Sequence, residues 1–271
     1  MRIRLAVDIG NTRIKIGLFD NDKFLILNKH LISELKKEKI IDTPLKFKEW
    51  LFSQSDWEIE EIAFSISGRI DHNLNTIIKS DVLGNPFAKC NFKSLFFPIP
   101  VRIYNDGIAS SLAFKYITTY DSYPFPCLCI SLGTGVAISV IDLACENNYE
   151  IFDCSNWVNS SIGSSEGIIP LHKAIKSKEK SKINNVQRYT NRVIRSIDQI
   201  IKTKYFKRFK YKPLTIFLNG GQITDLNLEK IETDLKIKLC ASVNDDKQII
   251  ENMFGILNAT KDNSTIKLYA V

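Results

Sequence analysis

The alternation of apolar and polar positions predicts β-strands over the first thirty residues. Residues 5–9 are mostly apolar and close on a Gly-Asn-Thr turn at 10–12, after which residues 13–19 alternate between polar and apolar side chains. This pattern predicts a β-hairpin. An Asp-Asn-Asp turn at 20–22 then leads into a third predicted strand, which begins at residue 23.

The next segments predict further elements of a mixed α/β fold. Thr43-Pro44 has the order of a helix N-cap followed by a first-turn proline. Residues 59–66 form a predicted strand that ends in Ser-Gly-Arg-Ile-Asp at 67–71. Residues 81–96 are too irregular for a core element and too apolar for a disordered one, which is typical of a segment that lines a pocket.

The second half of the chain repeats the organisation of its start. An apolar strand at 127–131 leads into Gly-Thr-Gly at 133–135 and then into another strand at 136–141. Two such hairpins predict an internally duplicated fold of two lobes that hold phosphate between them. The remaining predicted elements are a helix at 186–201, a strand at 214–218, a helix at 226–235, a strand at 237–241 and a helix at 246–259.

The candidate catalytic residue stands where a strand passes into a helix. The apolar run from Val101 ends in Asn105-Asp106-Gly107, and small residues at helical spacing follow. A carboxylate at a helix start stays ionised, because backbone N–H groups and the helix dipole stabilise its charge. Asp106 is therefore a candidate general base for a substrate hydroxyl. The alternative is an ordinary turn, since all three residues suit turns.

Glycine-containing turns are candidates for binding a nucleotide. The first turn can present backbone N–H groups and the Thr12 hydroxyl to phosphate oxygens. Asp8 precedes this turn and is a candidate for holding Mg²⁺ through water, the alternative being an ordinary hairpin with an exposed aspartate. Gly220-Gly221 follows a predicted strand, where it would let the backbone approach a flat ligand closely.

Composition and length indicate a globular protein of two lobes. The 271 residues are 44% hydrophobic and 25% charged, and this length suits two lobes, which we expect at 1–116 and 117–271. The start of the chain lacks the pattern of a signal peptide, and no apolar run approaches the ~20 residues that span a bilayer. We therefore expect a cytoplasmic protein with no membrane partner.

The pattern of basic residues bears on nucleic-acid binding, and the spacing of the cysteines bears on zinc binding. The net charge is +7, and lysines alternate with aromatic residues at 202–212, a pattern that superficially suggests nucleic acid. A solvated helix end is the favoured interpretation, so no nucleic-acid partner is expected. The six cysteines form no pair or Cys/His cluster with metal-ligand spacing, which predicts reduced thiols and no structural zinc.

Short motifs resemble those of the actin, hexokinase and Hsp70 ATPase superfamily. DIGNT at 8–12 resembles its first phosphate motif, SLGTG at 131–135 its second and LNGGQ at 218–222 its adenosine motif. The resemblance implies an α/β fold of two ribonuclease-H-like lobes, with ATP and the active site in the cleft between them.

The middle of the chain is similar to the ROK family of glucokinase-like sugar kinases. SGRID at 67–71, VLGNPF at 82–87 and PVRIYNDGIASS at 100–111 match that family's loop, sugar-contact segment and Asn-Asp motif in order. This resemblance implies phosphorylation of a hexose or N-acylated hexosamine by ATP and Mg²⁺, with Asp106 as general base, and a homodimer is expected. The implied substrate contacts are Gly68, Asn85, Asn105 and Glu166, and the implied ATP or phosphate contacts are Asp8, Gly10, Asn11, Thr12, Lys15, Gly133, Thr134, Gly135, Gly220 and Gly221.

Two departures from the ROK pattern keep other functions open. Gly-Asn-Thr followed by Lys15 resembles the first motif of type III pantothenate kinases, although that family usually has Gly-x-Asp-Arg where this chain has Tyr-Asn-Asp-Gly. ROK enzymes typically carry Gly-Glu-x-Gly-His, whereas Gly167 follows Glu166 here and no histidine stands two residues further on. The alternatives are a pantothenate-kinase-like enzyme and a non-catalytic sensor of sugar or nucleotide.

Overall fold

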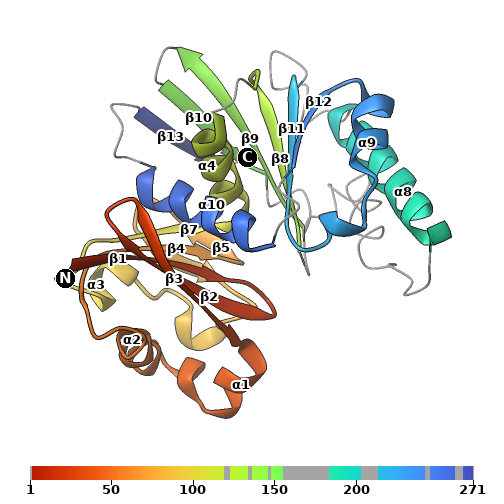
Figure 1. Ribbon diagram of the computed structural model, residues 1–271. Coiled ribbons are helices and arrows are strands. Elements are labelled where there is room, and N and C mark those ends of the chain that lie inside the picture. Colours follow the sequence, from red (N-terminus) through yellow and green to blue (C-terminus); the bar gives the residue numbers. More distant parts are fainter. Residues whose placement is uncertain are drawn as a thin grey trace. The chain divides into compact units, whose positions relative to one another are not determined.

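Two β-sheets organise the computed structural model, which describes residues 2–118, 123–133, 136–145, 148–154, 183–202, 213–241, 245–259 and 265–270 (Figure 1). Each sheet belongs to one of two compact units. Unit 1 comprises Met1–Ala109 and Ile250–Ala259, and unit 2 comprises Ser110–Ile249 and Thr260–Val271. Unit 1 thus contains a segment from late in the chain, Ile250–Ala259, and the predicted duplication did not assign this segment to it.

The sheet of unit 1 has the strand order β3-β2-β1-β4-β7. Its first three strands form an antiparallel meander, and its last two run parallel to β1. The predicted hairpin and third strand are therefore confirmed. The strands are β1 (Arg2–Ile9), β2 (Arg13–Asp20), β3 (Lys23–Leu31), β4 (Glu58–Ile66) and β7 (Val101–Asn105).

The sheet of unit 2 repeats this order as β10-β9-β8-β11-β12, with β13 (Thr265–Ala270) added beside β10. Strand directions also repeat, because β8, β9 and β10 are antiparallel neighbours while β11 and β12 run parallel to β8. The predicted α/β fold with an internal duplication is thus confirmed. These strands are β8 (Cys127–Leu132), β9 (Val136–Cys145), β10 (Asn148–Asp153), β11 (Thr215–Asn219) and β12 (Lys238–Ala241).

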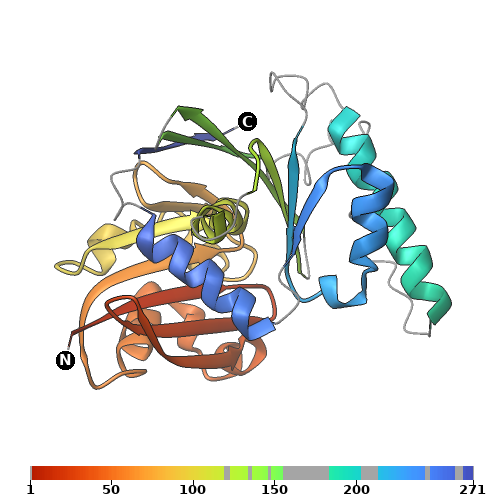
Figure 2. The same ribbon diagram turned by 45° about the horizontal axis from the view of Figure 1, so that its top comes forward.

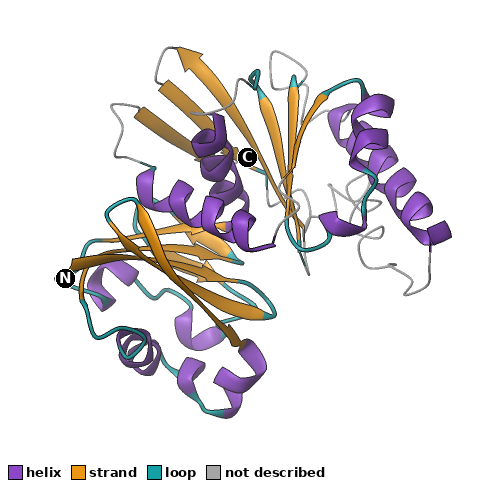
Figure 3. Cartoon of the chain, viewed as in Figure 1, coloured by secondary structure: helices purple, strands orange, loops and turns teal. Residues whose placement is uncertain are grey.

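Short helices cover one face of the unit 1 sheet (Figure 3). Helix α2 begins as predicted, because the Thr43 side chain accepts a hydrogen bond from the Lys46 N–H and Pro44 takes the first helical position. The helical elements are α1 (Ile32–Lys37), η1 (Ile40–Asp42), α2 (Pro44–Phe52), η2 (Asn85–Phe87) and α3 (Phe92–Leu95). A small hairpin of β5 (Arg69–Asp71) and β6 (Thr76–Lys79) lies between β4 and η2 in sequence.

The expectation that residues 81–96 are no part of the core is wrong. Val82, Leu83, Phe87, Phe92 and Phe96 are buried in the main cluster of unit 1. Their burial follows from aromatic packing on strand and helix side chains, which removes large rings from water even though the backbone is irregular.

The opposite face of the unit 1 sheet packs against α10 (Asp245–Asn258), as Figure 2 shows. Small residues allow this close approach. A Cβ on Gly17 would lie 2.5 Å from the Met253 sulfur and 2.8 Å from the Phe19 ring. The ring of Phe19 in turn packs edge-on against Phe254, with centroids 4.8 Å apart. Gly17 is therefore required by packing.

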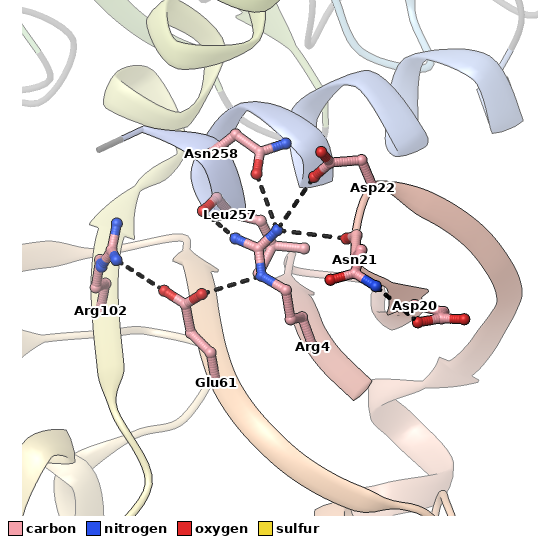
Figure 4. Close-up of polar contacts among 8 residues, drawn as sticks. All are labelled: Arg4, Asp20, Asn21, Asp22, Glu61, Arg102, Leu257 and Asn258. Atoms are coloured by element: carbon pink, nitrogen blue, oxygen red, sulfur yellow. Dashed lines mark hydrogen bonds and ion pairs between the residues drawn. The ribbon is translucent and has the colours of Figure 1, made fainter. Parts of the chain in front are cut away.

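A buried guanidinium fixes the end of α10 to the sheet (Figure 4). Arg4 is 2% exposed, and it donates to the Leu257 carbonyl and to Asn258 Oδ1 (2.9 Å). The same side chain pairs with Glu61 at 3.1 Å, and Glu61 pairs with Arg102 at 2.8 Å. A cation at a helix C-terminus satisfies carbonyls that have no partner within the helix and interacts favourably with its dipole.

The helices of unit 2 are α4 (Asp106–Thr118), α8 (Ile183–Lys202), η4 (Ile223–Asp225) and α9 (Leu228–Leu235). Helices α8 and α9 lie side by side (Figure 1), and the apolar stripe of α8 from Tyr189 to Ile200 is core. Burial raises the pKa of Tyr189, within this stripe, to about 12. Among the helices that the structure describes, none is long and apolar enough to cross a membrane.

Thiols contribute to the interior of unit 2. Cys127, Cys129, Cys154 and Cys240 are buried as thiols rather than joined in disulfides. Burial raises the pKa of the Cys127 and Cys154 thiols well above the ordinary value. These thiols therefore stay protonated at neutral pH and act as small hydrophobic side chains.

We expect Arg4→Met to lower the free energy of unfolding by about 3–5 kcal/mol, because it leaves buried polar partners without their cation. The matched control is Arg2→Met, whose Nε contacts Glu58 at a similar 3.2 Å but with both side chains about two-thirds exposed. That change should cost at most about 1 kcal/mol. Urea unfolding followed by circular dichroism measures both, and equal losses would contradict the role of burial.

Candidate functional site

Parallel pairing brings three segments of unit 1 to one edge of its sheet. Ile9 lies beside Ile66, and Ile66 lies beside Asn105, so β1, β4 and β7 end in register. The Gly-Asn-Thr turn, Ser67-Gly68 and the start of α4 follow these three ends directly. The carboxyl edge of the unit 1 sheet is therefore the candidate site, since loops at such an edge commonly bind ligands.

The candidate base is held at this edge by a capped helix. Asp106 is the first residue of α4 and is partly exposed. Asn105 is fully buried, and its Oδ1 accepts a 2.7 Å hydrogen bond from the Ile108 N–H. This bond is a helix cap, so Asn105 fixes the place where α4 begins and thereby the position of Asp106.

The first phosphate turn carries a cross-strand ion pair. Asp8 and Lys15 face each other in the hairpin register, and Lys15 Nζ lies 3.0 Å from Asp8 Oδ2. Both side chains are about a quarter exposed, at 22% and 26%. Sequence reasoning selected the two residues for separate reasons, and the structure brings them together.

The turn itself is short and open. The Gly10 N–H donates to the Arg13 carbonyl at 3.1 Å, and the Ile32 N–H donates to the Thr12 carbonyl at 3.0 Å. These two bonds fix both ends of the turn, while Asn11 and Thr12 stay exposed. Exposed backbone N–H groups and a hydroxyl held in a rigid turn suit phosphate oxygens.

The donor set fits Mg²⁺ bound largely through water. Asp8 supplies one partly exposed carboxylate, and only its Oδ2 contacts Lys15. Within the described ranges, no group of three or more His, Cys, Asp or Glu side chains could hold a metal ion. Mg²⁺ typically keeps several waters and takes its other ligands from phosphates, so a single carboxylate suffices.

Gly68 and Asn85 are joined through a residue that the sequence did not single out. A Cβ on Gly68 would lie 2.4 Å from the Lys79 carbonyl, so this position requires glycine. Ser80 Oγ donates to the Ser67 carbonyl at 2.9 Å, and the Ser80 carbonyl accepts from the Gly84 N–H at 2.9 Å. Ser80 therefore links the two loops. A lone serine between predicted elements gives no sequence signal for such a role.

A free positive charge stands beside Gly68. The Arg69 side chain is exposed, and it has no hydrogen bond or ion pair within the part of the chain that the structure describes. Its cross-strand neighbour Lys79 is also exposed and pairs with Asp81 at 3.4 Å. Arg69 is thus available to an anionic group near the carboxyl edge of unit 1.

Two further turns meet in unit 2. Strands β8 and β11 are parallel, with Ser131 beside Asn219, so both end at one edge of their sheet. Gly220 has φ +105°, and a Cβ on it would lie 2.3 Å from the Leu132 carbonyl oxygen. The Gln222 N–H donates to that oxygen at 3.0 Å. The predicted adenosine turn therefore packs directly on the end of β8, where the second phosphate turn begins.

The structure groups the predicted residues by unit. Three of them, Thr134, Gly135 and Glu166, lie outside the described residues. Unit 1 contains Asp8, Gly10, Asn11, Thr12, Lys15, Gly68, Asn85, Asn105 and Asp106, and unit 2 contains Gly133, Gly220 and Gly221.

Comparison with known proteins gives a family match. The family model described as type III pantothenate kinase matches residues 4–148. This span includes both units' first hairpins, the Gly68 loop and Asp106. No curated protein matches the chain significantly.

Solved structures match over nearly the whole chain at low identity. The ROK hexokinase of Thermus thermophilus has a TM-score of 0.61 at 14% identity, covering 96% of this chain and 100% of that one. The inorganic polyphosphate/ATP-glucomannokinase of Arthrobacter sp. strain KM has 0.63 at 16%, with 96% and 100% covered. The ROK glucokinase of Streptomyces griseus, in complex with glucose and AMPPNP, has 0.58 at 15%, with 96% and 99% covered. The fold is therefore that of these kinases.

Gly220→Ala should lower the free energy of unfolding by about 1–3 kcal/mol, because alanine resists a positive φ and its Cβ would collide with the Leu132 backbone. Gly10→Ala is the control, since a Cβ there would lie an ordinary 3.5 Å from its nearest atom, the Arg13 carbonyl oxygen. Calorimetric melting compares the two. If Gly220→Ala were the milder change, the packing described for the Gly220 turn would be wrong.

Proposed function

Because the chain belongs to the type III pantothenate kinase family, we propose that it transfers the γ-phosphoryl group of ATP to the hydroxyl of pantothenate. The observation that carries this proposal is the carboxyl edge of the unit 1 sheet. There the in-register ends of β1, β4 and β7 place a phosphate-type turn, the Gly68 loop and Asp106 together.

Asp106 acts as the general base in this proposal. Its carboxylate is stabilised in the charged form at the start of α4, and it accepts the hydroxyl proton as the oxygen attacks the γ-phosphorus. Phosphoryl transfer needs mainly positioning and neutralisation of charge, so a single well-placed base is sufficient. The Asn105 cap serves the positioning.

The Gly-Asn-Thr turn and Lys15 bind the phosphates. Lys15 is held by Asp8 at 3.0 Å, which keeps its ammonium group near the turn when no phosphate is present. Asp8 would hold Mg²⁺ through water, and the ion would supply positive charge against the phosphate oxygens. Gly220 and Gly221 border the adenosine in the proposed complex.

The negative charge of pantothenate supports its proposal as the acceptor. Pantothenate carries a carboxylate, and burying this group without a cation would be costly. Arg69 follows Gly68, is exposed and has no partner among the described residues. A guanidinium binds a carboxylate through paired hydrogen bonds, so we assign the acceptor carboxylate to Arg69.

A hexose or N-acylated hexosamine is the second candidate acceptor. The observation that favours it is Gly107, because the pantothenate kinase pattern has arginine after the catalytic aspartate. The similar structures carry the names hexokinase, glucomannokinase and glucokinase. Asn85, exposed beside the Gly68 loop, and Glu166 would then bind sugar hydroxyls. The homodimer and the cytoplasmic location stay predictions under either acceptor.

Asp106→Asn should lower kcat by roughly 10²–10⁴-fold, because it keeps the side-chain shape and removes the base. Glu229→Gln is the control, since it removes an exposed carboxylate from the first turn of α9 and loses only a comparable interaction with the helix dipole. A coupled assay of ADP release measures both. Retention of most activity by Asp106→Asn would refute the assignment of the base.

The acceptor is tested by comparing kcat/KM for pantothenate, glucose, mannose and their N-acetylated amines. We expect pantothenate to be used, and Arg69→Gln to lower its kcat/KM by roughly 10-fold or more through loss of a charge-assisted hydrogen bond. Lys79→Gln, which removes the cross-strand charge, should change it little. Turnover of sugars alone would establish the second candidate, and nucleotide binding without turnover of any acceptor would indicate a sensor.

A further inference from the structure

A buried hydrogen-bonded pair connects α4 to β11 within unit 2. Ser110 Oγ donates to Asn219 Oδ1 at 3.2 Å, and Asn219 Nδ2 donates to Ser110 Oγ at 2.8 Å. Ser110 is 1% exposed and Asn219 is 0% exposed. Water therefore cannot replace either partner without a local opening of the structure, which makes the pair sensitive to the loss of one group.

Asn219 stands immediately before the proposed adenosine turn. It is the last residue of β11, and Gly220 follows with φ +105° and its Cα packed on the Leu132 backbone. A turn that begins with its backbone packed this closely on a neighbouring strand depends on the position of the strand end that enters it. The amide of Asn219 fixes that strand end through Ser110.

Ser110 stands one helical turn after the proposed base. Residues separated by four positions lie on the same face of an α-helix, so Asp106 and Ser110 share a face of α4. The next residue, Ser111, makes its own buried hydrogen bond to Ser139 of β9 at 2.8 Å. Consecutive serines thus connect α4 to different strands. Of the two, Ser110 contacts the strand that enters the glycine turn, on which the Phe114 ring of α4 also packs through Phe217, with centroids 5.7 Å apart.

We propose that Ser110 and Asn219 are positioning residues that hold the adenosine turn in a fixed place within unit 2. The proposal rests on the proposed function in assigning a nucleotide to the Gly220-Gly221 turn. It adds that the affinity for nucleotide depends on a serine hydroxyl that touches neither nucleotide nor acceptor. The effect is transmitted by the position of the strand end.

The test measures ADP and ATP binding by isothermal titration calorimetry, with KM and kcat from the ADP-release assay. Ser110→Ala should raise the Kd and the KM for nucleotide by about 5- to 50-fold, since it removes the hydroxyl that hydrogen-bonds to the buried Asn219 amide. The KM for the acceptor should stay within about twofold. Ser111→Ala is the matched control, because it removes an equally buried hydroxyl bond and should lower the melting temperature similarly while leaving nucleotide affinity unchanged.

Asn219→Ala provides an independent variant, and the double variant with Ser110→Ala and Asn219→Ala completes a double-mutant cycle. If the two residues act as a pair, Ser110→Ala should add little to the effect of Asn219→Ala on nucleotide affinity. Unchanged nucleotide affinity in Ser110→Ala, or an equal loss in Ser111→Ala, would overturn the positioning role while leaving the proposed function intact. A wild-type protein that binds neither nucleotide would overturn the proposed function and the positioning role together.

Discussion

Parallel strand pairing determines where the candidate site forms. The hydrogen bonds that join β1 to β4 and β4 to β7 also align their carboxyl ends, so segments far apart in the sequence emerge at one edge. The same arrangement in unit 2 aligns the ends of β8 and β11, and Gly220 has no room for a side chain because β8 ends there. Duplication of one strand order therefore generates two edges of the same kind, each lined with glycine turns.

The sequence predicted those features that depend on near neighbours. The alternation in the first hairpin, the Thr43-Pro44 helix start and the strand-to-helix passage at Asp106 are local patterns, and each is present in the structure. The strands β5, β6, β10 and β13 were not predicted, because they are short or irregular in pattern and are defined by the strands that they pair with. The aromatic rings at 81–96 were assigned outside the core because an irregular backbone gives no periodic signal.

Contacts in the site between residues far apart in the sequence have no local signal that would predict them. Asp8 and Lys15 were both selected, but their ion pair follows from the hairpin register rather than from their spacing. Ser80, Ser110 and Asn219 are single polar residues whose partners lie elsewhere in the chain, so nothing local marks them. The sequence resembles two kinase families with different acceptors for a related reason. Phosphate motifs are contiguous in sequence, whereas selection of an acceptor depends on side chains from separate loops.

The position of α10 bears on how the protein is synthesised. Arg4 and its partners at Leu257 and Asn258 are some 250 residues apart in sequence, so synthesis supplies the partners long after Arg4. Domains generally fold as units during translation, but the first unit of this chain lacks its α10 segment until residues 250–259 have emerged. Until then, the nascent sheet exposes the face that Met253 and Phe254 later cover, and Arg4 has its partner Glu61 but lacks those on α10. A helix supplied from a distant part of the sequence thus delays completion of the first unit until residues 250–259 have been synthesised.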